Sequence, residues 1–195
     1  RYILNRINIV DILVSKGVID HLDHSSPKFA VGGKLGLDCT GNEIEELGIT
    51  ILDDVELLSK MQSISSEIKG LKQYYKDTKN PVCVISVDKQ RSQKYIFEDL
   101  KPLYSNIKIL IIVDEKTNDL DNPYMLIWRV TNNIDSNRDL YIEANTLCLD
   151  GTNKNSFDNF SRRWPGDVNC TKSVIDSLRE RKILDIDDEF IKTHQ

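Results

Sequence analysis

Residues 22–40, with the sequence LDHSSPKFAVGGKLGLDCT, carry the densest set of groups that could do chemistry. Three glycines, Gly32, Gly33 and Gly36, surround a lysine at position 34. Glycines that let backbone N–H groups approach an anion beside a lysine are typical of a phosphate cradle. The spacing matches neither G-x-x-x-x-G-K-[ST] nor G-x-G-x-x-G, and no apolar strand leads directly into it. A structural turn is therefore favoured over a phosphate site.

The same stretch offers candidate ligands for a metal or groups for a nucleophilic site, namely Asp20, His21, Asp23, His24 and Ser25. Histidines three residues apart could share a helical face, but Ser-Ser-Pro follows at once and disfavours a helix. We predict no metal site and no catalytic residue in this chain. A second acidic stretch, residues 113–121, follows an apolar run; a ligand site and a solvated loop that caps the next helix are both open readings of it.

Composition limits the classes of function. The chain has 195 residues, of which 39% are apolar and 29% charged, and its net charge is −5. The charge argues against nucleic acid as a partner, and no apolar run approaches the length of a membrane helix, so we expect no membrane insertion. The four cysteines are far apart in the sequence, which predicts reduced thiols without a disulfide and a cytoplasmic protein. The first residue is not methionine, and we expect a part of a longer protein.

Hydrophobic patterns predict alternating strands and helices. Residues 10–18 form a predicted strand, and the following stretch to Gly41 a predicted loop. The helical spacing from Asp53 onward predicts one long helix, or two with a break near Gly70. The runs Val82–Val87 and Ile107–Val113 are apolar except for Ser86 and Lys108. About 20 residues of helical pattern lie between them, with a helix over 92–104, and this arrangement predicts adjacent parallel strands.

Downstream, the pattern predicts helices over 122–133, 171–184 and 186–195, and a strand or bent strand pair over 138–149. The predicted fold class is α/β, with a mostly parallel sheet flanked by helices. Any division between domains is expected at 45–52.

Several segments together resemble a known family. These are VCVISVDKQ, KILIIVDEKTNDLDNPYMLIWRVTNNIDSNRDLYI, LDGTNK and RRWPGD, in this order over residues 80–170, together with the stretch 22–40. They are similar to the C-terminal domain of UbiD-type decarboxylases, the 3-octaprenyl-4-hydroxybenzoate carboxy-lyase family. The stretch 22–40 resembles the family pattern L-D-x-x-S-P followed by G-x-K-x-G-x-D-x-T, yet it precedes the other segments here.

The resemblance implies a partial tandem duplication, because LDCT at 37–40 is echoed by LDGT at 149–152. Residues 1–48 would be the tail of a first copy, a strand with a Gly-rich loop, in which Asp38 and Thr40 stand where Asp150 and Thr152 stand in the second. Residues 49–195 would be a second, UbiD C-terminal-like α/β domain that lacks the Ser-Ser-Pro loop.

The family resemblance also implies site residues. Leu22, Asp23, His24, Ser25, Ser26 and Pro27 would form a substrate-facing lid, supported by Gly33, Lys34, Gly36, Asp38 and Thr40. We expect a left-handed backbone at Gly33 or Gly36. Lys89 stands near a lysine region that approaches the cofactor phosphate in the family, although Gln90-Arg91-Ser92 replaces the glycine-containing turn expected after it.

The implied function is that of the C-terminal part of a carboxy-lyase acting on an aromatic, 4-hydroxybenzoate-like quinone precursor. The resemblance implies prenylated FMN, a divalent metal and potassium in the full-length enzyme and no cofactor in this part. It also implies an upstream flavin-binding domain of the same chain, which carries the catalytic groups, and a homo-oligomer. The alternative is a non-catalytic α/β scaffold that binds a protein partner or a small ligand.

Overall fold

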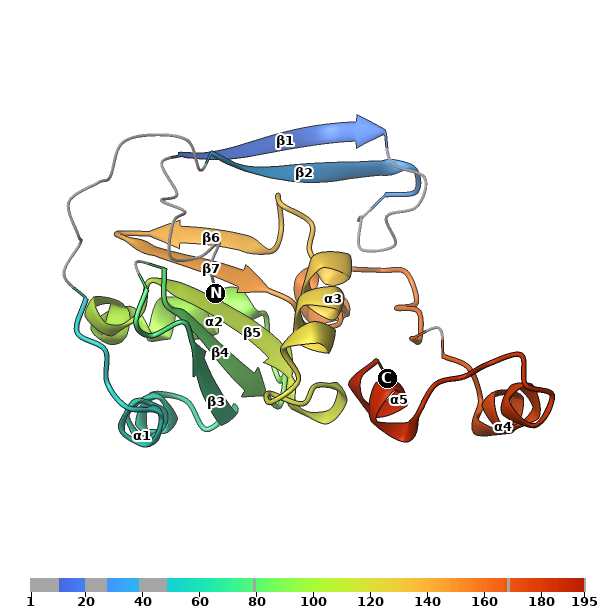
Figure 1. Cartoon of the computed structure of the whole chain (residues 1–195). Coiled ribbons are helices and arrows are strands. Elements are labelled where there is room, and N and C mark those ends of the chain that lie inside the picture. Colours follow the sequence, from blue (N-terminus) through green and yellow to red (C-terminus); the bar gives the residue numbers. More distant parts are fainter. Residues whose placement is uncertain (1–10, 20–27, 39–48, 79, 168, 195) are drawn as a thin grey trace.

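A computed structural model describes residues 11–19, 28–38, 49–78, 80–167 and 169–194. Its main sheet has the strand order β3-β4-β5-β7-β6. The strands are β3 (Ile68–Tyr74), β4 (Val82–Val87), β5 (Ile109–Asp114), β6 (Leu140–Glu143) and β7 (Thr146–Asp150). The central pairs β4–β5 and β5–β7 are parallel, and the edge strands β3 and β6 pair antiparallel (Figure 1). The predicted α/β class with a parallel centre is confirmed.

The predicted βαβ unit is also confirmed. Helix α2 (Gln93–Asp99) and a 3-10 helix, η1 (Lys101–Asn106), connect β4 to β5. Val82 pairs with Ile109 at the start of the two strands, and Val87 pairs with Asp114 at their end. The carboxyl ends of the two strands therefore lie at the same edge of the sheet.

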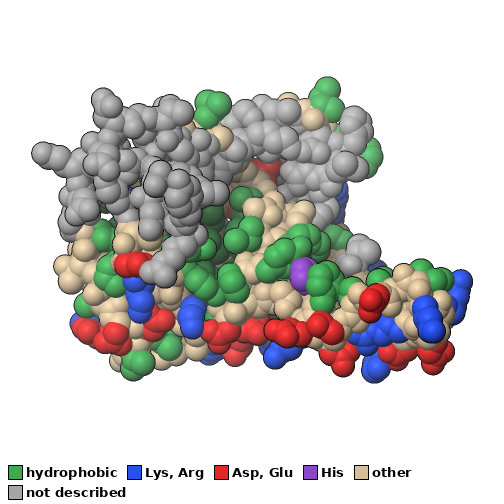
Figure 2. Space-filling view, in the orientation of Figure 1, with side chains coloured by type: hydrophobic (Ala, Val, Ile, Leu, Met, Phe, Trp, Pro, Cys, Tyr) green, Lys and Arg blue, Asp and Glu red, His purple; other side chains and the backbone are tan. Residues whose placement is uncertain are grey.

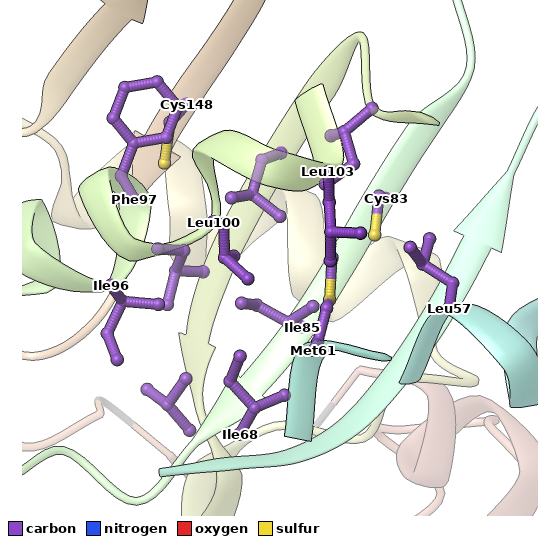
Figure 3. Packing of buried hydrophobic residues seen from close by; sticks show 14 residues of the cluster. Leu57, Met61, Ile68, Cys83, Ile85, Ile96, Phe97, Leu100, Leu103 and Cys148 are labelled. Carbon is purple, nitrogen blue, oxygen red and sulfur yellow. The ribbon is translucent and has the colours of Figure 1, made fainter. Parts of the chain in front are cut away.

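Helices cover both faces of this sheet, which explains the unbroken apolar runs. On one face, α1 (Asp54–Ile64), α2 and η1 pack on Ile85, Leu110 and Ile112 around one hydrophobic cluster, much of it labelled in Figure 3. On the other face, α3 (Pro123–Asn133) packs on Val84 and Val113 in a second cluster.

The long helix predicted from Asp53 is wrong in its second half. Asp53 caps α1 as expected, and its side chain accepts hydrogen bonds from two backbone N–H groups at 2.9 Å. The helix ends at Ile64, and Ile68–Tyr74 instead form β3 against β4. A side chain at Gly70 would lie 2.8 Å from Ser86 Oγ, so this glycine permits the close approach of the two strands. Pairing with β4 therefore outweighs the helical spacing of the apolar residues.

The C-terminal helices are α4 (Lys172–Glu180) and α5 (Asp188–Thr193), close to the predicted ranges. His194 ends α5 and contacts the ring of Tyr124 on α3, with ring centroids 4.4 Å apart. Asn122 also donates a hydrogen bond of 3.0 Å to the carbonyl of Thr193. Figure 2 shows hydrophobic side chains gathered on the face of the molecule where α3 and α5 lie. Among the described residues, no helix is long and apolar enough to cross a membrane.

The N-terminal part of the sequence contains a separate two-stranded sheet. Its strands β1 (Asp11–Ile19) and β2 (Val31–Asp38) pair antiparallel (Figure 1). The first strand was predicted, but the loop predicted up to Gly41 is partly wrong because it contains β2. A left-handed conformation was expected at Gly33 or Gly36. Gly36 lies in β2 without a positive φ, whereas Gly17, with φ 66°, occupies the left-handed region at an irregularity of the pairing.

Candidate functional site: a buried charged cluster at the carboxyl edge of the sheet

The carboxyl ends of β4, β5 and β7 meet at one edge of the main sheet, where open α/β sheets bind their ligands. Lys89 follows β4, Asp114 ends β5, and Asp150 ends β7. Ile112 pairs with Asp150, which brings the β7 end beside β5. The residues after Asp150 then run back across these strand ends.

Lys154 lies at the centre of the cluster, and its side chain is 0% exposed. Its ammonium donates hydrogen bonds to the carbonyls of Asp150 at 2.8 Å and Thr152 at 2.7 Å. It also lies 3.1 Å from Asp150 Oδ1 and 3.5 Å from Asp139 Oδ1. A buried ammonium is tolerated only when it is paired and hydrogen-bonded, and Lys154 meets both conditions.

Asp150 is fully buried, and its Oδ1 accepts hydrogen bonds from the backbone N–H of Thr152 at 3.0 Å and from its hydroxyl at 2.5 Å. Burial alone would raise the pKa of this carboxyl. The ammonium groups of Lys154 and Lys89, followed by the two bonds from Thr152, outweigh burial and lower the pKa below its ordinary value. Asp150 is therefore an anion at neutral pH. No hydrogen-bond partner for its Oδ2 exists among the described residues.

Asp139 shares Lys154 with Asp150 but has the opposite pKa shift. Burial raises its pKa, even though Lys154 and Arg138 favour the ionised form. The Arg138 guanidinium binds both carboxylate oxygens, at 2.8 and 2.7 Å. The backbone N–H of Asp135 donates a further hydrogen bond of 2.8 Å. This bidentate contact fixes Asp139 immediately before the start of β6.

Lys89 connects β4 to the chain after β7. Its ammonium donates to Asp158 Oδ2 at 2.6 Å, to the hydroxyl of Thr152 at 2.8 Å and to the carbonyl of Asn153 at 2.9 Å. The side chains of Lys89 and Asp158 are 5% and 3% exposed. Asp158 Oδ2 also accepts from the backbone N–H of Asn155, within a capping box.

Two further contacts fasten the chain after β7. Asp114 Oδ2 accepts a hydrogen bond of 2.7 Å from the backbone N–H of Asn153, and burial raises the pKa of this carboxyl. Gly151 lies so close to α3 that an added Cβ would be 2.7 Å from Val130 Cγ2. The cluster is a clamp that holds residues 150–158 against the ends of β4 and β5.

The clamp leaves one buried polar atom, Asp150 Oδ2, without a hydrogen-bond partner among the described residues. Its ammonium groups are bound by neighbouring acceptors, and no group of three or more His, Cys, Asp or Glu side chains in the described parts of the chain could hold a metal ion. Burial raises the pKa of the Cys83 and Cys148 thiols, so neither is a nucleophile at neutral pH. Lys89 could reach a phosphate only by giving up one of its three hydrogen bonds. Contact between Lys89 and a cofactor stays a prediction.

Most residues of the predicted lid and its support cannot be placed relative to this cluster, because they fall outside the described ranges. Leu22, Asp23, His24, Ser25, Ser26, Pro27 and Thr40 are outside the described residues. Gly33, Lys34, Gly36 and Asp38 lie in β2, and Asp38 is exposed at its end. Ile19 pairs with Val31, so the lid residues fall in the connection between two paired strands.

Sequence reasoning found Asp150 and Thr152 through the repeated motif but missed Lys154 and Asp158. One local signal for Lys154 was present: a lysine four residues after an aspartate, within LDGTNK. Its second partner, Asp139, becomes a neighbour only because β6 pairs with β7.

Comparisons with known proteins agree with this architecture. The family described as 3-octaprenyl-4-hydroxybenzoate carboxy-lyase C-terminal domain (UbiD_C) matches residues 48–176. This match covers well over half of the chain, so the chain belongs to the UbiD C-terminal domain family.

Two uncharacterized proteins of Helicobacter pylori, from strains 26695 and J99, are each 42% identical over 184 residues. The alignment covers 94% of this chain but 30% of each relative, so the chain spans less than a third of the length of these relatives.

Similar solved structures include an evolved dimeric form of the UbiD-class enzyme HmfF from Pelotomaculum thermopropionicum in complex with prFMN. It has a TM-score of 0.48 and 19% identity, and the match covers 67% of this chain and 29% of that one. Vanillic acid decarboxylase of Sedimentibacter hydroxybenzoicus in its open form has a TM-score of 0.48 and 15% identity, with 67% and 31% covered.

Proposed function

We propose that this chain is the C-terminal part of a UbiD-type carboxy-lyase that acts on an aromatic, 4-hydroxybenzoate-like acid. The family match over residues 48–176 carries the proposal. The buried charged clamp supports a division of labour, since the contacts of Lys89 and Lys154 can rigidify an α/β domain. The catalytic groups and the prenylated FMN, with its divalent metal and potassium, would then belong to an upstream domain of the same cytoplasmic protein.

In this proposal the chain has two copies of one unit. Residues 1–48 are the tail of a first copy, and residues 49–195 are a second. The lid at 22–27 extends from the first copy toward the substrate. The second copy has only Ala144 and Asn145 between β6 and β7, and therefore no lid. The role of the second copy is to add stability and oligomer contacts.

Reconstitution of the full-length protein with prenylated FMN tests this function. We expect stoichiometric flavin and release of CO2 from 4-hydroxybenzoate or a close analogue, measured by absorbance and product chromatography. The 195-residue chain alone is the matched control and should bind no stoichiometric flavin. A full-length protein without flavin and without turnover would contradict the proposal and favour the scaffold alternative. Sedimentation of the full-length protein tests the oligomer.

A further inference from the structure

The two hairpins of the structure have the same strand register at their ends. In the first hairpin, Ile12 of β1 pairs with Leu37 of β2. In the second, Leu140 of β6 pairs with Leu149 of β7. The aspartate that follows each leucine, Asp38 or Asp150, is the last residue of its strand.

The acidic residues across the hairpin ends also correspond. Asp11 pairs with Asp38 at the start of β1. Asp139 immediately precedes β6, and its carbonyl accepts a hydrogen bond of 2.8 Å from the backbone N–H of Asp150. The repeat seen in the sequence at LDCT and LDGT therefore extends to the opposite strand, where DIL at 11–13 stands in the place of DLY at 139–141. The lengths of the two connections differ, yet the pairing is the same.

The second hairpin shows what surrounds this unit in a complete sheet. One edge of β7 pairs with β6, and the other pairs in parallel with β5 over Leu147–Asp150. The pair Tyr141–Cys148 faces the main core, where Cys148 is fully buried and Tyr141 stacks on Phe97 at 5.9 Å. Both a parallel strand beside β7 and a helical layer are needed to build these surroundings.

The first hairpin lacks both neighbours within the part of the chain that the structure describes. β1 is the only strand that pairs with β2 there. The pair Leu13–Gly36 stands where Tyr141–Cys148 stands in the second hairpin, and Leu13 is 72% exposed. A bare strand edge beside an exposed leucine favours association with another segment.

We propose that the second edge of β2 binds a parallel strand from the segment of the same polypeptide just upstream of Arg1. The helix before that strand, in the position that α2 has before β5, would form part of the layer that covers Leu13. This inference rests on the two-copy arrangement of the proposed function, which it deepens by naming the missing contact. The partner is in the same chain because the relatives of this protein are more than three times as long as the matched region.

The second copy also gives the position of the missing strand. β5 begins about 30 residues before β6, and a parallel pair needs a crossover connection of this order. Counted back from the start of β1 at Asp11, the same spacing places the missing strand about 15 to 20 residues before Arg1. It should be an apolar run of about six residues, as β5 is, because helices on both faces bury such a strand.

Hydrogen exchange of the full-length protein tests the pairing directly. We expect the amides of Val31–Asp38 to exchange about as slowly as those of Thr146–Asp150, within about tenfold, since both strands would be central. Exchange of the β2 amides about 100-fold faster than those of β7, as at an open strand edge, would overturn the proposal.

Paired variants of the full-length protein test the buried face. Leu13→Asp should lower the melting temperature by several degrees or prevent folding, because a carboxylate would enter a covered layer. Ile142→Asp is the matched control, since Ile142 is also an aliphatic strand residue and is 54% exposed. Equal, small effects of both changes would contradict the covering of Leu13, and the exchange experiment on the unmodified protein remains decisive if Leu13→Asp does not fold.

The same experiments separate this inference from the proposed enzymatic function. Protected β2 amides in a full-length protein that binds no flavin would support the completed sheet and contradict the decarboxylase. Unprotected β2 amides in an active, flavin-loaded protein would contradict only the completed sheet.

Discussion

The hairpins β1–β2 and β6–β7 share a pairing register but have very different surroundings. In β6–β7 the terminal aspartate, Asp150, is buried against Lys154, and a two-residue turn closes the hairpin. In β1–β2 the terminal aspartate, Asp38, is exposed, and the long connection carries the predicted lid. One strand pattern can thus serve as a closed structural element or as the base of a functional loop, depending on the residues that follow the aspartate and on the length of the turn.

The largest expected effect concerns the cation that anchors the second hairpin. Lys154→Ala should lower the free energy of unfolding by about 3 to 5 kcal/mol, because it leaves Asp150 and Asp139 buried without their shared ammonium. Urea unfolding followed by circular dichroism measures the change. Lys172→Ala is the control; its side chain is 88% exposed and pairs with Asp176 within one helix, so about 0.5 kcal/mol or less is expected. Equal midpoints for both variants would show that the cluster does not anchor the hairpin.

The next effect tests how tightly the second hairpin is packed. Gly151→Ala should cost about 1 to 3 kcal/mol, because the added Cβ would lie 2.7 Å from Val130 Cγ2 and 3.3 Å from Val130 Cα. The backbone of α3 would have to move. Gly166→Ala is the control, since nothing lies near a Cβ at that position. An unchanged midpoint for Gly151→Ala would show that α3 can shift freely against the chain after β7.

The lid gives the corresponding test for the first hairpin. In the full-length enzyme, His24→Ala should lower kcat/KM by about 10- to 100-fold through poorer positioning of substrate, without loss of bound flavin. Steady-state kinetics and the flavin absorbance measure the two quantities. His194→Ala is the control, because His194 packs on Tyr124 and Phe190 at the C-terminal helix. Unchanged kinetics for His24→Ala would contradict the lid hypothesis.

The sequence predicted those parts of the fold whose signal is local. β4 is apolar except for Ser86, and β5 is apolar up to its last residue, Asp114. Such runs are typical of strands covered on both faces, and the parallel pairing of the two strands followed from the helix between them. β3 was missed because Ile68, Leu71 and Tyr75 fit a helical period as well as a short strand, and only pairing with β4 decides between the two. β2 was missed because its glycines also favour a turn.

The candidate site was predicted less completely for the same reason. The repeated motif identified Asp150 and Thr152, but the partners of the buried lysines come from distant positions. Asp158 lies 69 residues after Lys89, and only the ends of β4 and β7 bring them to 2.6 Å. No local pattern indicates such a pair.

The smallest expected effect is on the pH dependence of stability. It separates the contribution of Asp114 from that of Asp150, the two aspartates that end β5 and β7. Burial raises the pKa of Asp114 above its ordinary value of 3.8, whereas the pKa of Asp150 lies below that value. A carboxyl with a raised folded-state pKa stabilises the fold below its unfolded pKa, and this contribution is lost as the pH rises through the folded pKa. Asp150 behaves oppositely: its contribution to stability is present above pH 3.8 and is lost as the pH falls below that value.

Replacing Asp114 by Asn, which can still accept the hydrogen bond from Asn153, removes only the contribution of Asp114. We therefore expect the unfolding free energy of Asp114→Asn to improve relative to the unmodified chain as the pH rises above 3.8, measured by urea unfolding at several pH values. Asp185→Asn, at an exposed position, is the control for the exchange of a carboxylate for an amide. If Asp114→Asn instead loses stability relative to the unmodified chain as the pH rises, the ionised carboxylate of Asp114 stabilises the fold. The ammonium of Lys89 would then favour the ionised form of Asp114 as strongly as it favours that of Asp150.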